Sequence, residues 1–168
     1  MNRQVLLSTL ESIRFLNGVS ADDLEQLADI ARLEEFEEGD VLFAAGDSVD
    51  NVYLVVGGEI TLEVNGSGVS PQRLLTVGPG ESLGWSALIR RRQRVSTAKV
   101  SAPTLVFRID GEQLLAVCEQ NTRLGYQIMR STAAALADRL HAMRMRFLEV
   151  YRLQPNSFLC DNAEVGVD

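Results

Sequence analysis

The chain has little histidine and cysteine, the side chains most typical of zinc sites and of several kinds of catalytic centre. Its 168 residues include one histidine and two cysteines. Cys118 and Cys160 do not combine with His141 in any spacing typical of a metal site. His141 also lacks a serine or cysteine nucleophile in a recognisable catalytic arrangement. We therefore expect no metal centre, no cofactor and no enzymatic activity.

Long apolar runs are missing as well. No run approaches the roughly 20 residues that a membrane-spanning helix needs. The first 16 residues carry Glu11 and lack the apolar core and cleavage site of a signal peptide. Two unclustered cysteines are not the disulfide framework of a small secreted domain. The expectation is a cytoplasmic protein with no membrane partner.

The sequence also lacks an excess of basic residues. Sixteen lysines and arginines stand against 23 acidic residues, for a net charge of −7. Proteins that bind nucleic acids without sequence preference usually carry a basic excess. The length and the 46% hydrophobic fraction suit one globular domain with a core. We expect no direct nucleic-acid partner.

From about Leu33 to Ile109, apolar residues recur with the period of two that predicts β-strands. Turn pairs such as Gly46-Asp47, Gly57-Gly58 and Asn65-Gly66 separate these segments. Some eight short strands at close spacing predict an antiparallel roll, not a parallel sheet. The clearest strand segments are Val41–Phe43, Val52–Val56, Ile60–Val64, Arg73–Val77, Thr97–Val100 and Thr104–Ile109.

Helices are predicted on both sides of the roll. Ser20 can cap a helix near the N-terminus, Asp110 can cap Gly111–Glu119, and Asn121 can cap a long helix from Thr122 to about Tyr151. The predicted fold class is α+β, mainly β. It is an eight-stranded, jelly-roll-like antiparallel β-roll with N-terminal helices and a long C-terminal helix.

The long helix, about residues 122–151, carries an apolar seam with alternating steps of four and three. The seam consists of Met129, Ala133, Leu136, Leu140, Met143, Phe147 and Val150. It predicts either a homodimer through this helix or a helix packed lengthwise on its own domain. We favour the homodimer, because a small roll cannot cover a helix of ~45 Å. The predicted domain spans residues 1–152, and the aperiodic residues 153–168 are expected to be disordered.

The most informative stretch is Gly78–Val100, which runs from a glycine-rich turn through a short amphipathic segment to a basic cluster. A turn that leads into a short helix can present free backbone N–H groups to an anion. Arg94 follows Gly84 at a spacing that would let a guanidinium close on the same anion. The alternative is a surface turn with solvated arginines.

The order of these elements and the glycine pattern resemble the cyclic nucleotide-binding domain, over about Phe15 to Tyr151. This is the sensory module of the catabolite-activator family, of cyclic-nucleotide-dependent kinase regulatory subunits and of gated channels. The family's phosphate-binding cassette, roughly G-E-x-A-L followed by R-x-A-T, is matched by Gly84–Leu88 and Arg94–Thr97. Trp85 stands where the family has the glutamate that binds the ribose 2′-hydroxyl, and Glu81 lies four residues too early to replace it.

The resemblance implies that an anionic effector such as cAMP or cGMP binds beside the cassette and signals through the C-terminal helix to a partner protein. No DNA-binding domain of its own is expected. It also implies that Arg144, on that helix, could cover the base. The alternative is an interaction or scaffold module that keeps the fold and has lost the ligand, with Trp85 filling the site. The predicted ligand-binding residues are Leu83, Gly84, Trp85, Ser86, Ala87, Arg94, Val95, Ser96 and Arg144.

Overall fold

The computed structural model describes residues 2–64, 71–89 and 93–152. The predicted Asn65-Gly66 turn, the three arginines at 90–92 and the predicted disordered tail at 153–168 lie outside the described residues. Contacts divide the chain into two compact units, Met1–Ala133 and Ala134–Asp168. Each unit is described by itself.

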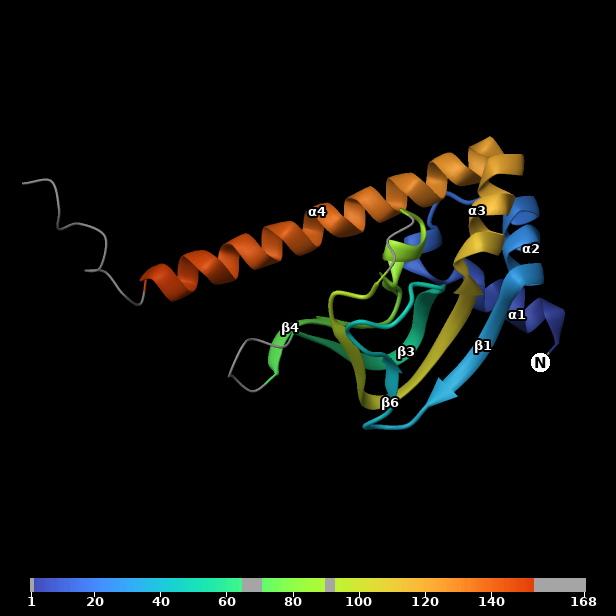
Figure 1. The fold of residues 1–168 in the computed structure, drawn as a ribbon. Coiled ribbons are helices and arrows are strands. Elements are labelled where there is room, and N and C mark those ends of the chain that lie inside the picture. The colour runs from blue at the N-terminus through green and yellow to red at the C-terminus, as the bar shows by residue number, and fades with distance from the viewer. Residues whose placement is uncertain (1, 65–70, 90–92, 153–168) are drawn as a thin grey trace, which may run out of the picture. The chain divides into compact units, whose positions relative to one another are not determined.

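The first unit contains an antiparallel sheet that forms the predicted roll. In the described residues its main path runs β1-β6-β3-β4, while β2 pairs with β6 and β5 pairs with β3. Figure 1 shows how strongly β3, β4 and β6 curve. The strands are β1 (Ala31–Phe36), β2 (Val41–Phe43), β3 (Asn51–Val64), β4 (Gln72–Val77), β5 (Ser82–Leu83) and β6 (Thr97–Asp110).

The described sheet has six strands, whereas the sequence predicts some eight. Two pairs of the predicted segments are continuous, and β1 and β5 are not among the clearest predicted segments. β3 passes through Gly57-Gly58 and β6 passes through Pro103, where the sequence suggests turns. The pairing of β3 with β6 shifts register between Val55 and Ile60. Such bulges bend a strand without ending it, and they are places where glycine and proline are tolerated in sheets. The fold class is confirmed, with fewer and longer strands.

Two hydrophobic clusters lie on opposite faces of the sheet. Val106 and Phe107 are neighbours on β6 and both are fully buried. Val106 packs inside the roll with Val55 and Ile60, whereas Phe107 packs against the helices. Because successive strand residues point to opposite faces, β6 holds the roll and the helical layer together.

The helices begin where the capping residues predict. Ser20 accepts from the backbone N–H of Asp23, Asp110 from that of Gln113 and Asn121 from that of Leu124. Figure 1 shows α1, α2 and α3 beside one another at one end of the sheet. No helix of the described residues is long and apolar enough to span a membrane. The helices are α1 (Arg3–Glu11), α2 (Ala21–Ile30), α3 (Gly111–Gln120), α4 (Thr122–Arg152) and the short 3₁₀ turns η1 (Arg14–Leu16) and η2 (Trp85–Ala87).

A buried carboxylate joins the start of α2 to the junction of α3 and α4. Asp23 accepts from Asn121 Nδ2 at 2.7 Å and from Arg123 Nη2 at 2.9 Å. Arg123 also donates to the hydroxyl of Ser20 at 2.8 Å. Burial alone would raise the pKa of Asp23, but hydrogen bonds from Ser20, Asn121 and Arg123 outweigh burial and hold this pKa below its ordinary value.

Asp23→Asn is expected to lower the free energy of unfolding by about 1–3 kcal/mol at neutral pH, because an uncharged amide at this buried position accepts more weakly from Asn121 and Arg123 and brings an N–H donor of its own. The lowered pKa of Asp23 means that its contribution is complete above the unfolded value of about 4 and is lost as the pH falls through the folded pKa. Urea unfolding at a series of pH values should therefore show the wild type and the variant converging in acid.

The control for this prediction is Asp29→Asn, which removes an exposed carboxylate on the same helix. Asp29 pairs with Arg3 at 2.7 Å, and both side chains are largely exposed. An exposed pair of this kind is worth less than about 1 kcal/mol. If the two variants lost the same stability with the same dependence on pH, the assigned role of Asp23 would be wrong.

Candidate functional site

Arg94 is the centre of the candidate site, and its backbone is fixed by the turn at Gly46-Asp47. Its N–H donates to the Asp47 carbonyl and its own carbonyl accepts from the Gly46 N–H, both at 2.9 Å. The residue is only 5% exposed. A backbone held at both its donor and its acceptor keeps the arginine at one place on the roll.

Three contacts position the guanidinium. Nη2 donates to the Asn51 carbonyl at 2.7 Å, and Nη1 donates to the Gly84 carbonyl at 3.3 Å. The guanidinium carbon lies 4.2 Å from the centre of the Phe43 ring. Stacking on an aromatic face and donating to carbonyls are both favourable for a planar cation. Neither kind of contact neutralises its charge.

The electrostatics of Arg94 favour an anion. Burial lowers the pKa of the guanidinium, and the nearby Tyr53, Asp50 and Asp47 oppose this effect only in part. Arginine nevertheless stays charged at neutral pH. Its buried Nε has no hydrogen-bond partner among the described residues. A buried cation with an unmatched donor is expected to bind an anion strongly, because little of its charge is solvated.

The turn before η2 depends on a glycine. Gly84 has φ of 82°, and a methyl group on it would lie 2.5 Å from the Asn51 carbonyl oxygen. Its carbonyl accepts from the N–H of Ala87 at 3.0 Å, while the N–H of Leu88 donates to the Trp85 carbonyl at 2.9 Å. η2 is therefore a single 3₁₀ turn within the short amphipathic segment that the sequence predicts. The backbone N–H groups of Trp85 and Ser86 remain as candidate donors to a ligand.

The predicted ligand-binding residues do not all present their side chains in the same way. Gly84 touches Arg94 directly through its carbonyl. Trp85 and Ser86 are half-buried, whereas Leu83, Ala87 and Ser96 are buried. The side chain of Val95 is 66% exposed. Arg144 is an exposed residue of α4 in the second unit.

Leu83 and Val95 can therefore contribute through their backbones more readily than through their side chains. Leu83 is fully buried inside the roll and pairs with Tyr53 of β3. An apolar side chain already packed in a core is not available to a polar ligand. The exposed isopropyl group of Val95 offers no hydrogen bond.

Sequence reasoning missed Phe43, Asn51, Asp47 and Asp50, which surround Arg94. The alternation of apolar residues predicts that Phe43 lies on a strand, but nothing in that pattern indicates a contact with an arginine far along the chain. Asn51 contributes a backbone carbonyl, which any residue carries. The turn signal at Gly46-Asp47 was visible, yet only the fold places it beside Arg94.

Glu81 is occupied elsewhere and does not replace the glutamate that Trp85 displaces. Its Oε2 accepts from the backbone N–H of Gly78 at 2.7 Å, and its Oε1 lies 3.4 Å from Arg14 Nη2. Within the described residues no group of histidine, cysteine and carboxylate side chains could hold a metal ion. The groups that the site presents are the guanidinium of Arg94 and the backbone N–H groups of Trp85 and Ser86, which are hydrogen-bond donors.

The chain matches a protein-family model over more than half of its length. The model of the cyclic nucleotide-binding domain matches residues 33–121, which include most of β1, the strands β2 to β6, the cassette and α3. Among curated proteins, Glutaminase 1 of Bradyrhizobium diazoefficiens is 30% identical over 125 residues, which is 74% of this chain and 20% of that protein. The chain spans less than half the length of the curated relatives it matches.

Solved structures agree with the family match. A protein from Geobacter metallireducens, assigned to cyclic nucleotide binding, has a TM-score of 0.69 and 29% identity. The similarity covers 84% of this chain and 99% of that one. A cyclic nucleotide-binding domain from Methylobacillus flagellatus has a TM-score of 0.76 and 18% identity, over 97% of this chain and 86% of that one. The second likeness concerns the fold alone.

Proposed function

The chain belongs to the cyclic nucleotide-binding domain family, and from this membership we propose that it is a sensor of a small cyclic nucleotide, cAMP or cGMP. The observation that carries the proposal is Arg94, a nearly fully buried cation with an unmatched Nε donor at the position of the family's phosphate-binding arginine. The cyclic phosphate would bind Arg94 and the backbone N–H groups of Trp85 and Ser86.

The cassette meets the helices at the start of α3. The Gly111 N–H, at the start of α3, donates to the Asp50 carbonyl at 2.7 Å. Ala87 of η2 approaches Gly111 so closely that a methyl group there would lie 2.6 Å from the Ala87 Cβ. A shift of η2 on ligand binding would therefore move α3, and Asn121 joins α3 to α4 directly. We propose that α4 is the output element and that it pairs with a second copy of the chain.

Trp85 favours a second candidate function. A half-buried indole occupies the place of the family's ribose-binding glutamate, so the site could be altered or filled. The fold would then serve as a scaffold for a protein partner, without a nucleotide. The two functions differ in whether a nucleotide binds.

Trp85 also provides the test, because it is the chain's only tryptophan. Titration of the full chain with cAMP and cGMP, followed by calorimetry and by tryptophan fluorescence, is expected to show saturable heat and a matching fluorescence change. The noncyclic 5′-AMP is the control for general anion binding. An absence of heat and of fluorescence change up to millimolar nucleotide would reject the sensor and favour the scaffold.

A further inference from the structure

An open groove lies beside α3 in the first unit. Its volume is about 750 Å³, and it is bordered by η2 and by the segment before β3. Glu112, Leu115, Ala116 and Glu119 line it from α3, at steps of three and four that place them on one face of the helix. Val49 and Ala87 add apolar surface from the opposite side.

The groove is acidic as well as apolar. Four carboxylate residues and no basic residue are among its described lining residues. The carboxylate residues are Asp50, Asp110, Glu112 and Glu119. A surface that combines apolar side chains with one sign of charge fits an amphipathic segment of the opposite sign. We refer to it as the acidic groove.

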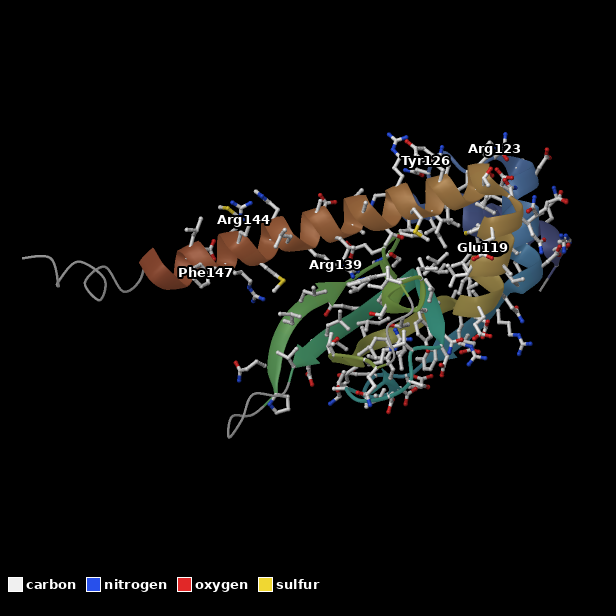
Figure 2. The ribbon with its side chains drawn as sticks, turned by 45° about the horizontal axis from the view of Figure 1, so that its top comes forward. Glu119, Arg123, Tyr126, Arg139, Arg144 and Phe147 are labelled. Carbon is white, nitrogen blue, oxygen red and sulfur yellow. The ribbon has the colours of Figure 1, made fainter. Side chains whose placement is uncertain are left out.

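The second unit supplies such a segment. In the part of α4 that belongs to the second unit, Leu140 and Phe147 are each 59% exposed, and Met143 is exposed too. Arg139, Arg144 and Arg146 occupy the positions that flank this seam, and Figure 2 labels two of them on the helix. We refer to these six residues as the arginine-flanked stripe.

Pairing of the stripe with itself is electrostatically unfavourable. In a parallel two-stranded coiled coil, the seam residues occupy positions a and d of each heptad. The residue that precedes an a position lies opposite the residue five places later on the other helix. This register sets Arg139 of one copy against Arg144 of the other, twice by symmetry. Asp138 and Glu149, the carboxylate residues in the part of α4 that belongs to the second unit, do not occupy positions beside the seam and so do not lie between these arginines. Like charges across an interface act against the pairing.

We propose that the acidic groove of each copy receives the arginine-flanked stripe of a second copy. The leucine, methionine and phenylalanine of the stripe would cover Leu115, Ala116 and Val49. The arginines would face the groove carboxylates, so a reciprocal pair buries both apolar surfaces and matches both charges. This inference rests on the proposed pairing through α4.

Salt dependence separates this docking from self-pairing. Sedimentation equilibrium of the full chain should show a dimer whose dissociation constant rises about tenfold or more between low and high ionic strength, because salt screens attraction. A self-paired seam would tighten with salt, since its arginines repel. A tightening dimer, or a chain that is monomeric at every salt concentration, would overturn the proposal. Nucleotide binding is measured separately and would survive either result.

A single charge reversal should change the affinity of the dimer in opposite directions for groove docking and for a self-paired seam. Arg144→Glu should weaken the dimer about tenfold if the stripe meets carboxylates. In a self-paired seam the same change would place a carboxylate against Arg139 of the other copy and strengthen the dimer. Strengthening would therefore contradict groove docking.

Exchange of the two charges between Glu112 and Arg144 should restore the affinity of the dimer. Glu112→Lys should weaken the dimer by itself, and in combination with Arg144→Glu it should restore affinity to within about threefold of the wild type. Glu38→Lys, an exposed acidic-to-basic change between β1 and β2, is the matched control and should leave the dimer unchanged. Glu112 and Arg144 are both exposed, so the circular dichroism spectra of the variants should match that of the wild type. A failure of the double variant to recover would refute the pairing of these two surfaces.

Discussion

Arg94→Ala is expected to reduce the affinity for cAMP or cGMP about 100-fold or more. The bound cyclic phosphate would lose a buried, charge-assisted contact, and truncation of one partner of such a pair costs about 3 kcal/mol or more. The effect should be large because Arg94 is 5% exposed and its guanidinium is held in place by hydrogen bonds to the Asn51 and Gly84 carbonyls. A preorganised donor loses little freedom on binding.

Two further variants make this result interpretable. Arg94→Lys keeps the charge but has no planar fork, so binding should fall by about tenfold or more even though the site stays cationic. Arg73→Ala removes an arginine that is mostly exposed on β4 and should leave the affinity unchanged. Calorimetry and the fluorescence of Trp85 measure all three variants, and near-ultraviolet circular dichroism checks the fold. Full-affinity binding by Arg94→Ala would place the phosphate elsewhere.

Gly58→Ala is expected to lower the free energy of unfolding by about 3 kcal/mol or more. Gly58 has φ of 89°, a conformation that costs a residue with a side chain about 1–2 kcal/mol. The added methyl group would also collide with Thr104, whose Cα would lie 2.5 Å away, and with the Pro103 carbonyl. Overpacking of this kind costs a further 1–3 kcal/mol or so. For a domain of this size the melting temperature should fall by about 6 °C or more.

The neighbouring glycine provides a matched control. A methyl group on Gly57 would meet nothing within 4 Å in the described structure, and Gly57 is not among the glycines with positive φ. Gly57→Ala should therefore change the melting temperature by no more than about 2 °C. Equal losses for the two variants would mean that the bulge in β3 does not depend on the close approach of β3 to β6.

Local features of the fold could be predicted from the sequence. Ser20, Asp110 and Asn121 each cap the helix that follows them, as their side-chain chemistry suggests. A cap depends only on residues within one turn, so its signal is contained in a few adjacent letters. The period of two likewise indicated an antiparallel roll. The spacing of Gly84 and Arg94 places the two residues near one another, and in the structure Arg94 donates to the Gly84 carbonyl. The anion site itself stays a prediction.

Strand boundaries and the surroundings of Arg94 could not be predicted in the same way. Gly57-Gly58 has the composition of a turn, but pairing with β6 turns it into a bulge within one long strand. Phe43 and Asn51 meet Arg94 because β2 and β3 are neighbours of the cassette in space. Backbone carbonyls and ring stacking leave no distinctive residue pattern.

The sequence by itself determined the helices, the roll and the position of the arginine proposed to bind an anion, because caps, alternation and spacing act over short stretches of chain. Only the tertiary structure decided that this arginine is buried with an Nε unmatched among the described residues, and that Asp50 and α3 form an acidic groove. Burial and charge convergence arise from segments far apart in the chain, and their free energies depend on distances that no local pattern contains.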